Sequence, residues 1–300
     1  MPYIIDNANV LHNGKIDSAS LLVDSSRICL MKKTLDEYQF IRFNASTYMM
    51  TPGHVMFDYT LNDSFSFIEF KEYFIQNILN SGCTALITAA KVQFEGELEK
   101  KAAAQRQLFI NSPIDYYLAA EIPVKRLSPS LLRKCKKLKI SIIFLDITEE
   151  KELHTVPWGW IKDAMSAFPS ILIPRLKGSK RSRLRSGKTK SLWKIISLDH
   201  GISSLPFTPL EHKRLSKEML MLLGIYPDKG EIRTGGAVDY NLYESGERCG
   251  LVETEPVLDY DITIPAVTVH KNRVLKAGSQ ITFPPGYGEE CFIPMIKRFG

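Results

Sequence analysis

The sequence lacks a long apolar run. No stretch approaches the roughly 18 consecutive apolar residues that mark a membrane-spanning helix. The first ten residues, MPYIIDNANV, contain neither the basic segment nor the long apolar segment of a secretory signal peptide. These two absences predict a cytoplasmic protein that has no membrane partner.

Cysteine is also scarce, with five residues in 300. The cysteines are scattered, odd in number and never spaced as Cys-x-x-Cys, so we expect neither a disulfide framework nor a structural zinc site. Cys83 begins an apolar run. A nucleophilic cysteine needs a paired base and a place at a strand's C-terminal end, so we interpret Cys83 as a buried core thiol.

Acidic residues are absent from one segment. Residues 175–194 read RLKGSKRSRLRSGKTKSLWK, with nine basic residues, whereas the whole chain has a net charge of +6. The remainder is therefore mildly acidic, since 6 − 9 = −3. One interpretation is a surface loop that binds a polyanion or an acidic protein partner. The alternative is a solvated loop of no function. The candidate anion-binding residues are Lys177, Lys180, Arg181, Arg183, Arg185, Lys188 and Lys190.

Apolar runs and helical patterns alternate through the middle of the chain. Residues 3–48 and 230–300 show short strand-like runs broken by turns. Between them, continuous apolar strands are predicted at 82–90, 114–122, 139–147, 170–176 and 193–199, after a first strand near 50–61. Helical stretches separate several of these runs, and strands that alternate with helices indicate a parallel sheet or barrel.

Two helices have clear end signals. Ser128 and Pro129 are suited to the N-cap and first helical position of a helix that carries an apolar stripe of Leu131, Leu132, Cys135 and Leu138. Residues 211–224 predict the last helix of the βα region. Gly224 is expected to form its left-handed C-terminal cap.

The order of segments predicts an α/β fold with two parts. Residues 51–224 are expected to form a reduced or incomplete TIM-like (β/α) barrel that carries the basic loop 175–194. Residues 1–50 and 225–300 are expected to form a small composite β-sandwich domain from both termini. The span from Thr51 to Gly224 is 174 residues, below the ~200–250 of a complete barrel.

Several segments resemble the cyclic-amidohydrolase branch of the amidohydrolase superfamily (dihydroorotase, hydantoinase and allantoinase). LLGIYPDKGEIRTGGAVDYNLYE at 222–244 is similar to their signature GLYPxKGxIxxGxDADLVxxD. TYMMTPG at 47–53 resembles the lead-in to their first barrel strand. IISLDHG at 195–201 resembles the end of their last barrel strand. The resemblance implies a barrel with a C–N hydrolase ancestry.

The same resemblance implies two metal ions, held by His-x-His, a carboxylated lysine, two further histidines and an aspartate. Asp58 and Thr60 stand where His-x-His is expected, and threonine is a poor ligand for a zinc-type ion. Ile143 and Phe144 occupy the strand expected to carry the lysine, and His154 is the one histidine of 150–192. The sequence therefore predicts that no binuclear centre forms.

Three residues are the candidate catalytic set. Asp199, with His200 beside it, matches the family's catalytic aspartate, and Asp58 would also lie at a C-terminal strand end. Facing each other, Asp58 and Asp199 could act as paired carboxylates or hold one hard divalent cation such as Mg²⁺. Alternatively, they are solvated remnants of ancestry. His54 begins its strand, at the end opposite the expected site, and is not interpreted as a ligand.

Two functional hypotheses follow. The first is a pseudoenzyme: a degenerate amidohydrolase-like protein without binuclear-metal activity that acts as a binding, scaffold or regulatory protein. The second is a residual hydrolase of carbon–nitrogen bonds in cyclic amides that uses Asp199 and His200 with at most one metal ion. No cofactor is expected under the first hypothesis, and a single divalent metal ion belongs to the second.

The shortened barrel also predicts assembly. A barrel that has lost βα units leaves two strand edges with unpaired backbone groups. We therefore expect the gap to be covered by another copy of the chain or by the β domain, with a homodimer favoured. The resemblance also implies a homo-oligomer, because members of this family commonly oligomerise.

Overall fold

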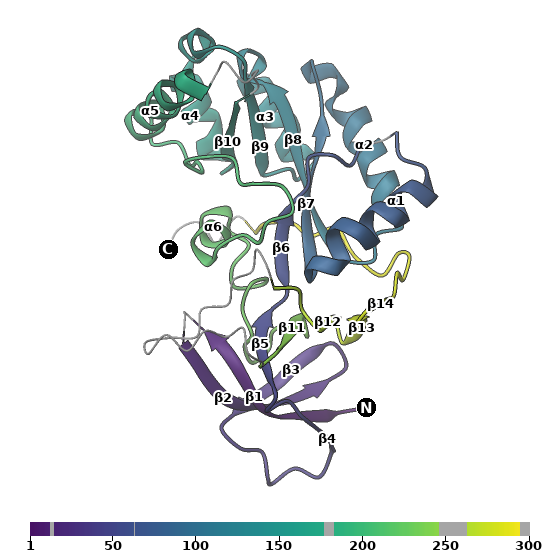
Figure 1. The fold of residues 1–300 in the computed structure, drawn as a ribbon. Coiled ribbons are helices and arrows are strands. Elements are labelled where there is room, and N and C mark those ends of the chain that lie inside the picture. The colour runs from purple at the N-terminus through teal and green to yellow at the C-terminus, as the bar shows by residue number, and fades with distance from the viewer. Residues whose placement is uncertain (13–14, 63, 177–182, 246–262, 295–300) are drawn as a thin grey trace.

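The fold consists of a parallel sheet with helices on its outer face and a second, mixed sheet beside it (Figure 1). The computed structural model describes residues 1–12, 15–62, 64–176, 183–245 and 263–294. Within these residues, no helix has the length and apolar character needed to span a membrane.

The parallel sheet has five strands in the order β10-β9-β8-β7-β6. They are β6 (His54–Phe57), β7 (Cys83–Lys91), β8 (Asp115–Pro123), β9 (Ile142–Ile147) and β10 (Ile171–Leu176). Almost every residue of these strands is buried, because helices cover one face and a chain segment with α6 (Lys217–Leu223) fills the other. The continuous apolar runs therefore predicted these strands correctly.

The mixed sheet has nine strands and contains both ends of the chain. They are β1 (Tyr3–His12), β2 (Lys15–Asp24), β3 (Arg27–Lys32), β4 (Ile41–Asn44), β5 (Tyr48–Pro52), β11 (Tyr240–Glu244), β12 (Val267–His270), β13 (Arg273–Ala277) and β14 (Gln280–Ile281). Strand β5 joins the two halves, since it pairs with β1 on one side and β11 on the other. The predicted fold class, an incomplete TIM-like barrel with a β-sandwich domain from both termini, is confirmed. The predicted domain boundaries stay a prediction.

The chain passes from one sheet into the other through Gly53. This residue follows β5 and precedes β6, and a Cβ added here would lie 2.2 Å from Thr84 Oγ1. Glycine is therefore needed for the close approach of β6 to β7. Gly224 ends α6 with φ of 70°, which confirms the predicted left-handed cap.

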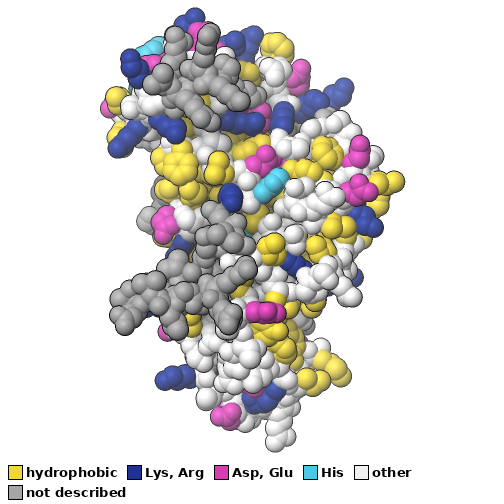
Figure 2. Space-filling model, in the orientation of Figure 1, with side chains coloured by type: hydrophobic (Ala, Val, Ile, Leu, Met, Phe, Trp, Pro, Cys, Tyr) yellow, Lys and Arg dark blue, Asp and Glu magenta, His cyan; other side chains and the backbone are white. Residues whose placement is uncertain are grey.

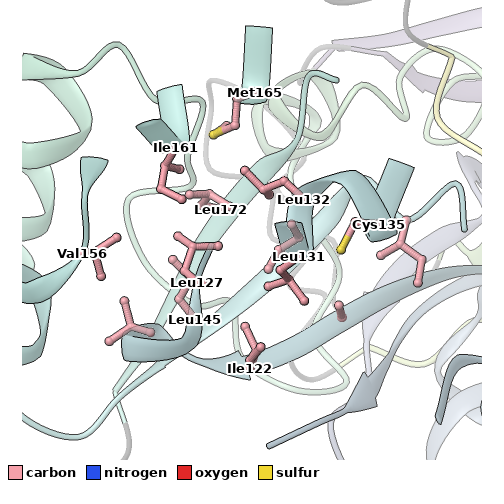
Figure 3. Close-up of a cluster of buried hydrophobic side chains, with 14 of the residues drawn as sticks. Ile122, Leu127, Leu131, Leu132, Cys135, Leu145, Val156, Ile161, Met165 and Leu172 are labelled. Atoms are coloured by element: carbon pink, nitrogen blue, oxygen red, sulfur yellow. The ribbon is translucent and has the colours of Figure 1, made fainter. Parts of the chain in front are cut away.

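Helices cover the outer face of the parallel sheet (Figure 1). They are α1 (Phe67–Tyr73), α2 (Leu98–Phe109), α3 (Pro129–Lys137), α4 (Trp158–Ala167) and α5 (Arg183–Asp199). Ser128 caps α3 by accepting the Leu131 N–H at 3.0 Å, and Pro129 is its first residue, as predicted. Leu131, Leu132 and Cys135 of α3 then pack with Ile161 of α4 in one apolar cluster (Figure 3).

One strand prediction is wrong. Residues 193–199 belong to α5 and not to a strand, so the basic segment 175–194 is not a single loop. Trp193 and Ile196, three residues apart, are buried on the sheet side of α5, whereas Ile195 and Leu198 are exposed. The apolar side chains thus lie on two faces of a helix. In a short, continuous apolar run the helical period cannot be distinguished from that of a buried strand.

Residues 203–215 pair with both edges of the parallel sheet. At one edge Ser204 forms a parallel bridge to Leu172 of β10. At the other, the N–H groups of His212 and Leu215 donate to the carbonyl groups of Phe57 and Val55 in β6, at 3.1 and 2.9 Å.

This crossing segment, residues 203–215, thus supplies partners within the chain at both edges, where a second copy of the chain or the β domain was expected. The homo-oligomer itself stays a prediction, which light scattering tests. The crossing segment also shortens the predicted helix 211–224, since α6 begins only at Lys217.

Candidate functional site

Asp58 lies at the C-terminal end of β6, the end of a βα barrel that usually carries function. Its carboxylate is fully buried and has four polar partners within hydrogen-bonding distance. Oδ1 accepts the N–H groups of Thr60 at 3.0 Å and Leu61 at 2.7 Å, while Oδ2 accepts the Tyr73 hydroxyl at 2.7 Å. Phe57, completely buried in the sheet interior, fixes the backbone from which Asp58 extends.

His212 reaches the same carboxylate from the crossing segment. Its Nε2 lies 2.7 Å from Asp58 Oδ2 and 3.0 Å from the Tyr73 hydroxyl. Glu211, the preceding residue, places Oε1 3.8 Å from that nitrogen and also accepts the Tyr59 N–H at 2.7 Å. Burial, followed by the hydrogen bond to Asp58, raises the pKa of Tyr73, so this hydroxyl stays protonated. Asp58, Glu211 and His212 thus converge on one point.

A cavity of about 570 Å³ lies beside these residues at the C-terminal ends of β9 and β10. Its wall is largely apolar, with a few polar side chains. The lining residues are Tyr59, Ile147, Pro174, Arg175, Leu176, Thr189, Lys190, Trp193, Pro206, Phe207, Thr208, Pro209, Leu210 and Glu211. Size, apolar wall and convergent polar groups are typical of a small-molecule site.

Arg175 closes one side of the cavity and is itself paired. Its Nη1 lies 2.5 Å from Glu121 Oε2 and its Nε 4.0 Å from Asp146 Oδ1. The guanidinium packs over the Tyr59 ring, with 4.7 Å between the guanidinium carbon and the ring centroid. Arg175 is therefore held by carboxylates at the ends of β8 and β9. It forms part of the cavity wall, and its positive charge is largely balanced by these carboxylates.

The structure does not bring the predicted catalytic set together. Asp199 is exposed at the end of α5, and His200 follows it. Gly201 to Ser203 lie against Ser170, at the N-terminal end of β10, whereas Asp58 lies at the C-terminal end of β6. Asp199 is not at a strand end because its segment is helical.

The candidate anion-binding residues divide into three groups. Lys177, Lys180 and Arg181 lie outside the described residues, and Arg183 and Arg185 belong to the first turns of α5. Lys188 and Lys190 are exposed on α5, and Lys190 also borders the cavity. Figure 2 shows other lysine and arginine side chains on the same end of the molecule. Anion binding stays a prediction.

Two other residues singled out from the sequence are structural. His54 is buried and lies 3.0 Å from the Ser81 carbonyl through Nδ1 and 3.1 Å from the Tyr243 hydroxyl through Nε2. Burial, then the charge of Arg214, lowers its pKa to about 3, so it remains neutral. Cys83 is fully buried, and burial raises its thiol pKa to about 12, as expected for a core thiol.

The family-like signature at 222–244 contributes to a second polar cluster, at the junction of the two sheets. Lys229 Nζ lies 2.7 Å from Asp115 Oδ2 and 2.5 Å from Asp239 Oδ2, and all three side chains are buried. His270 Nδ1 lies 3.0 Å from Asp239 Oδ1, and Lys271 Nζ lies 2.7 Å from Asp115 Oδ1. Burial opposes the charge of Lys229, but Asp239 and Asp115 outweigh it and raise the pKa.

Sequence reasoning missed Glu211 and His212. Asp58 and His212 are 154 residues apart, and residues 211–224 have the pattern of a helix. The metal-binding set implied by the resemblance does not fit the structure either. Among the described side chains, His212 is the one imidazole within hydrogen-bonding distance of Asp58. A binuclear centre needs several imidazoles at that point.

Comparisons with known proteins give the fold. No protein-family model matches the sequence, and no curated protein matches it. The structure is similar to that of a D-hydantoinase with a TM-score of 0.71 and 12% identity, over 98% of this chain and 99% of that chain.

Two further solved structures resemble it. The dihydropyrimidinase from Brevibacillus agri NCHU1002 gives a TM-score of 0.71 and 10% identity, over 97% of this chain and 98% of that chain. The L-hydantoinase (dihydropyrimidinase) from Arthrobacter aurescens gives a TM-score of 0.69 and 10% identity, over 96% of this chain and 99% of that chain. The chain thus has a hydantoinase-like fold. This agrees with the family branch that the sequence segments resemble.

Proposed function

We propose that this chain is a degenerate, amidohydrolase-like protein that binds a small molecule at the C-terminal end of its parallel sheet and does not hydrolyse cyclic amides. In this proposal it acts as a binding, scaffold or regulatory protein. The hydantoinase-like fold supports the ancestry. The geometry around Asp58 supports the loss of hydrolysis.

One observation carries the proposal. Asp58 is fully buried, and both of its oxygens accept hydrogen bonds, from Leu61 and Tyr73 among others. Its one imidazole partner among the described residues is His212. Two bridged metal ions would need more ligands than this site provides, and the water activation that such ions supply contributes several kcal/mol to hydrolysis.

The cavity supports the binding role. A volume of about 570 Å³ accommodates a drug-sized molecule, and aromatic and aliphatic groups such as Trp193 and Phe207 line it. Lys190 adds a cation at the rim, whereas Arg175 is held by Glu121. These features favour an apolar molecule that carries one anionic group.

Two measurements test the proposal. Hydantoin and dihydrouracil are incubated with the purified protein, with and without Zn²⁺ or Mn²⁺, and ring opening is followed by ultraviolet absorbance. We expect no turnover above the metal-only control. Steady ring opening that requires the protein would contradict the proposal.

The binding role is tested with anilinonaphthalene sulfonate, an apolar anion whose fluorescence reports the cavity. Leu210 lines the cavity and is 72% exposed. The larger side chain of Leu210→Trp therefore fits without disturbing the core, and it occupies space that the ligand would use. We expect binding to weaken at least about tenfold, or 1.4 kcal/mol. Leu198→Trp, at a leucine of α5 that is 69% exposed and not among the lining residues, is the matched control. Equal binding by both variants would refute the cavity as the site.

A residual hydrolase is the second candidate. Asp199 and His200 lie far from the cluster, but Asp58, Glu211 and His212 together offer a base and at most one metal ion. A buried carboxylate that orients an imidazole is a familiar general-base arrangement. Turnover of an activated cyclic amide that is abolished by His212→Gln would favour this candidate.

A further inference from the structure

Two clusters of carboxylate and imidazole groups occur among the described residues. One contains Asp115, Asp239 and His270, all buried, and the other contains Asp58, Glu211 and His212. Each cluster combines two carboxylates with one imidazole, but their charges are balanced differently. That difference decides which of them is suited to a metal ion.

The first cluster already contains a cation. Lys229 Nζ lies between the two carboxylates, 2.7 Å from Asp115 and 2.5 Å from Asp239. Lys271 Nζ approaches Asp115 from another side at 2.7 Å. A metal ion would have to displace a buried ammonium group, at a large electrostatic cost. This cluster is therefore a closed ion-pair network.

The second cluster has no lysine or arginine in it. Within the described part of the chain, the ion pairs of Asp58 and Glu211 involve only His212. Asp58 is fully buried and otherwise contacts neutral donors, the Tyr73 hydroxyl and two backbone N–H groups. Two carboxylate oxygens and an imidazole nitrogen within 4.8 Å of one another thus share at most one positive charge. An added cation would relieve this imbalance.

We propose that Asp58 Oδ2, Glu211 Oε1 and His212 Nε2 form a mononuclear site for a divalent transition-metal ion. The imidazole favours Zn²⁺, Co²⁺ or Mn²⁺ over Mg²⁺ and Ca²⁺, which prefer oxygen ligands alone. The Tyr73 hydroxyl, 2.7 Å from Asp58 Oδ2, then serves as an outer partner that orients this carboxylate. Two of the three ligands come from the crossing segment and not from the strand ends that carry the binuclear centre in the resemblance.

The site deepens the proposed function and rests on the same cavity. Glu211 is both a ligand of the proposed ion and part of the cavity wall. Three protein ligands leave a fourth position of a tetrahedral ion open. An anionic oxygen of the bound molecule, such as a carboxylate, is the chemical group that this position would take.

Metal binding is measured on the whole chain with the metal ion alone. Co²⁺ is added to chelator-treated protein while its visible absorption is followed, and Zn²⁺ affinity and stoichiometry are measured by calorimetry. We expect one ion per chain. We also expect His212→Gln to weaken binding by more than about 100-fold, because loss of an outer partner alone costs 10–100-fold.

The control is His200→Gln, which removes a partly exposed histidine at the opposite end of the sheet. It should leave the affinity unchanged. Glu211→Gln, at a side chain that is 31% exposed, provides a second test if His212→Gln alters the far-UV circular dichroism. It should weaken binding at least tenfold.

Absence of binding, two ions per chain, or full affinity in both His212→Gln and Glu211→Gln would overturn the site. Failure of anilinonaphthalene sulfonate binding with the metal site intact would instead refute only the proposed ligand cavity. The two conclusions are thereby separated.

Discussion

The ion-pair network around Lys229 predicts a large loss of stability on one substitution. Lys229→Met keeps the length of the side chain but removes the charge that lies 2.7 Å from Asp115 and 2.5 Å from Asp239. Their side chains are only 3% and 8% exposed, so water does not replace the ammonium group. Removal of one partner from a buried ion pair costs about 3–5 kcal/mol.

The variant is compared with the parent by urea unfolding at pH 7 and by thermal melting. About 3 kcal/mol or more corresponds to a melting temperature lower by about 6 °C or more in a chain of this size. Lys32→Met is the matched control, because Lys32 and Glu37 are 3.2 Å apart and about half exposed. An exposed pair of this kind contributes about 0–1 kcal/mol.

The pH dependence has a definite sign. Burial opposes ionisation of Asp115, but the hydrogen bond from His270 and the charge of Lys229 keep its carboxyl pKa below the ordinary value, and Asp239 is held low in the same manner. Lowered carboxyl pKa values stabilise the fold above the unfolded pKa of about 4 and lose that effect as the pH falls.

The deficit of Lys229→Met should therefore shrink between pH 7 and pH 4, because protonation removes the uncompensated charge. Adding Asp239→Asn should recover part of it for the same reason. A Lys229→Met protein as stable as the Lys32→Met control would refute the reasoning.

Two further predictions concern stability. His54, whose pKa is lowered to about 3, binds a proton near pH 6.5 only when unfolded, so it destabilises the fold progressively as the pH falls from 6.5. The free energy of unfolding of His54→Gln should therefore fall less steeply between pH 6 and pH 4, by about 1 kcal/mol per pH unit. Urea titration at each pH measures this slope, and a slope equal to that of the parent would contradict the prediction. Gly53→Ala should cost about 1–3 kcal/mol, because its Cβ would lie 2.2 Å from Thr84 Oγ1, whereas Gly96→Ala, with no neighbour within 4 Å, should cost under about 1 kcal/mol in the same melts. Equal melting temperatures for the two alanine variants would disprove the steric argument.

The parallel strands were predictable because burial on both faces demands continuous apolar runs, and 82–90 and 139–147 have them. The helical conformation of residues 193–199 was not predictable. Trp193 and Ile196 show the helical spacing of buried residues only once Ile195 is known to face solvent. A local pattern of six or seven residues does not distinguish these cases.

The candidate site was half predictable. Asp58 follows a strand within a recognisable segment, so its place at the sheet's functional end could be inferred. His212 depends on a crossing segment whose course is set by pairing with both sheet edges. Lys229 and Asp239 belong to the segment that resembles the family signature. The sequence did not indicate that Asp115, 114 residues from Lys229, is their partner.

The pairing of the crossing segment with β6 also has a consequence for synthesis on the ribosome. The backbone partners of Phe57 and Val55 lie in His212 and Leu215, about 155 and 160 residues later in the chain. At ~5–20 residues per second, the growing chain exposes this apolar strand edge for roughly 8–30 s before its partner exists. Contacts of such long sequence separation also slow folding after release. The β6 edge is thus the part of the nascent chain where we expect a chaperone to bind.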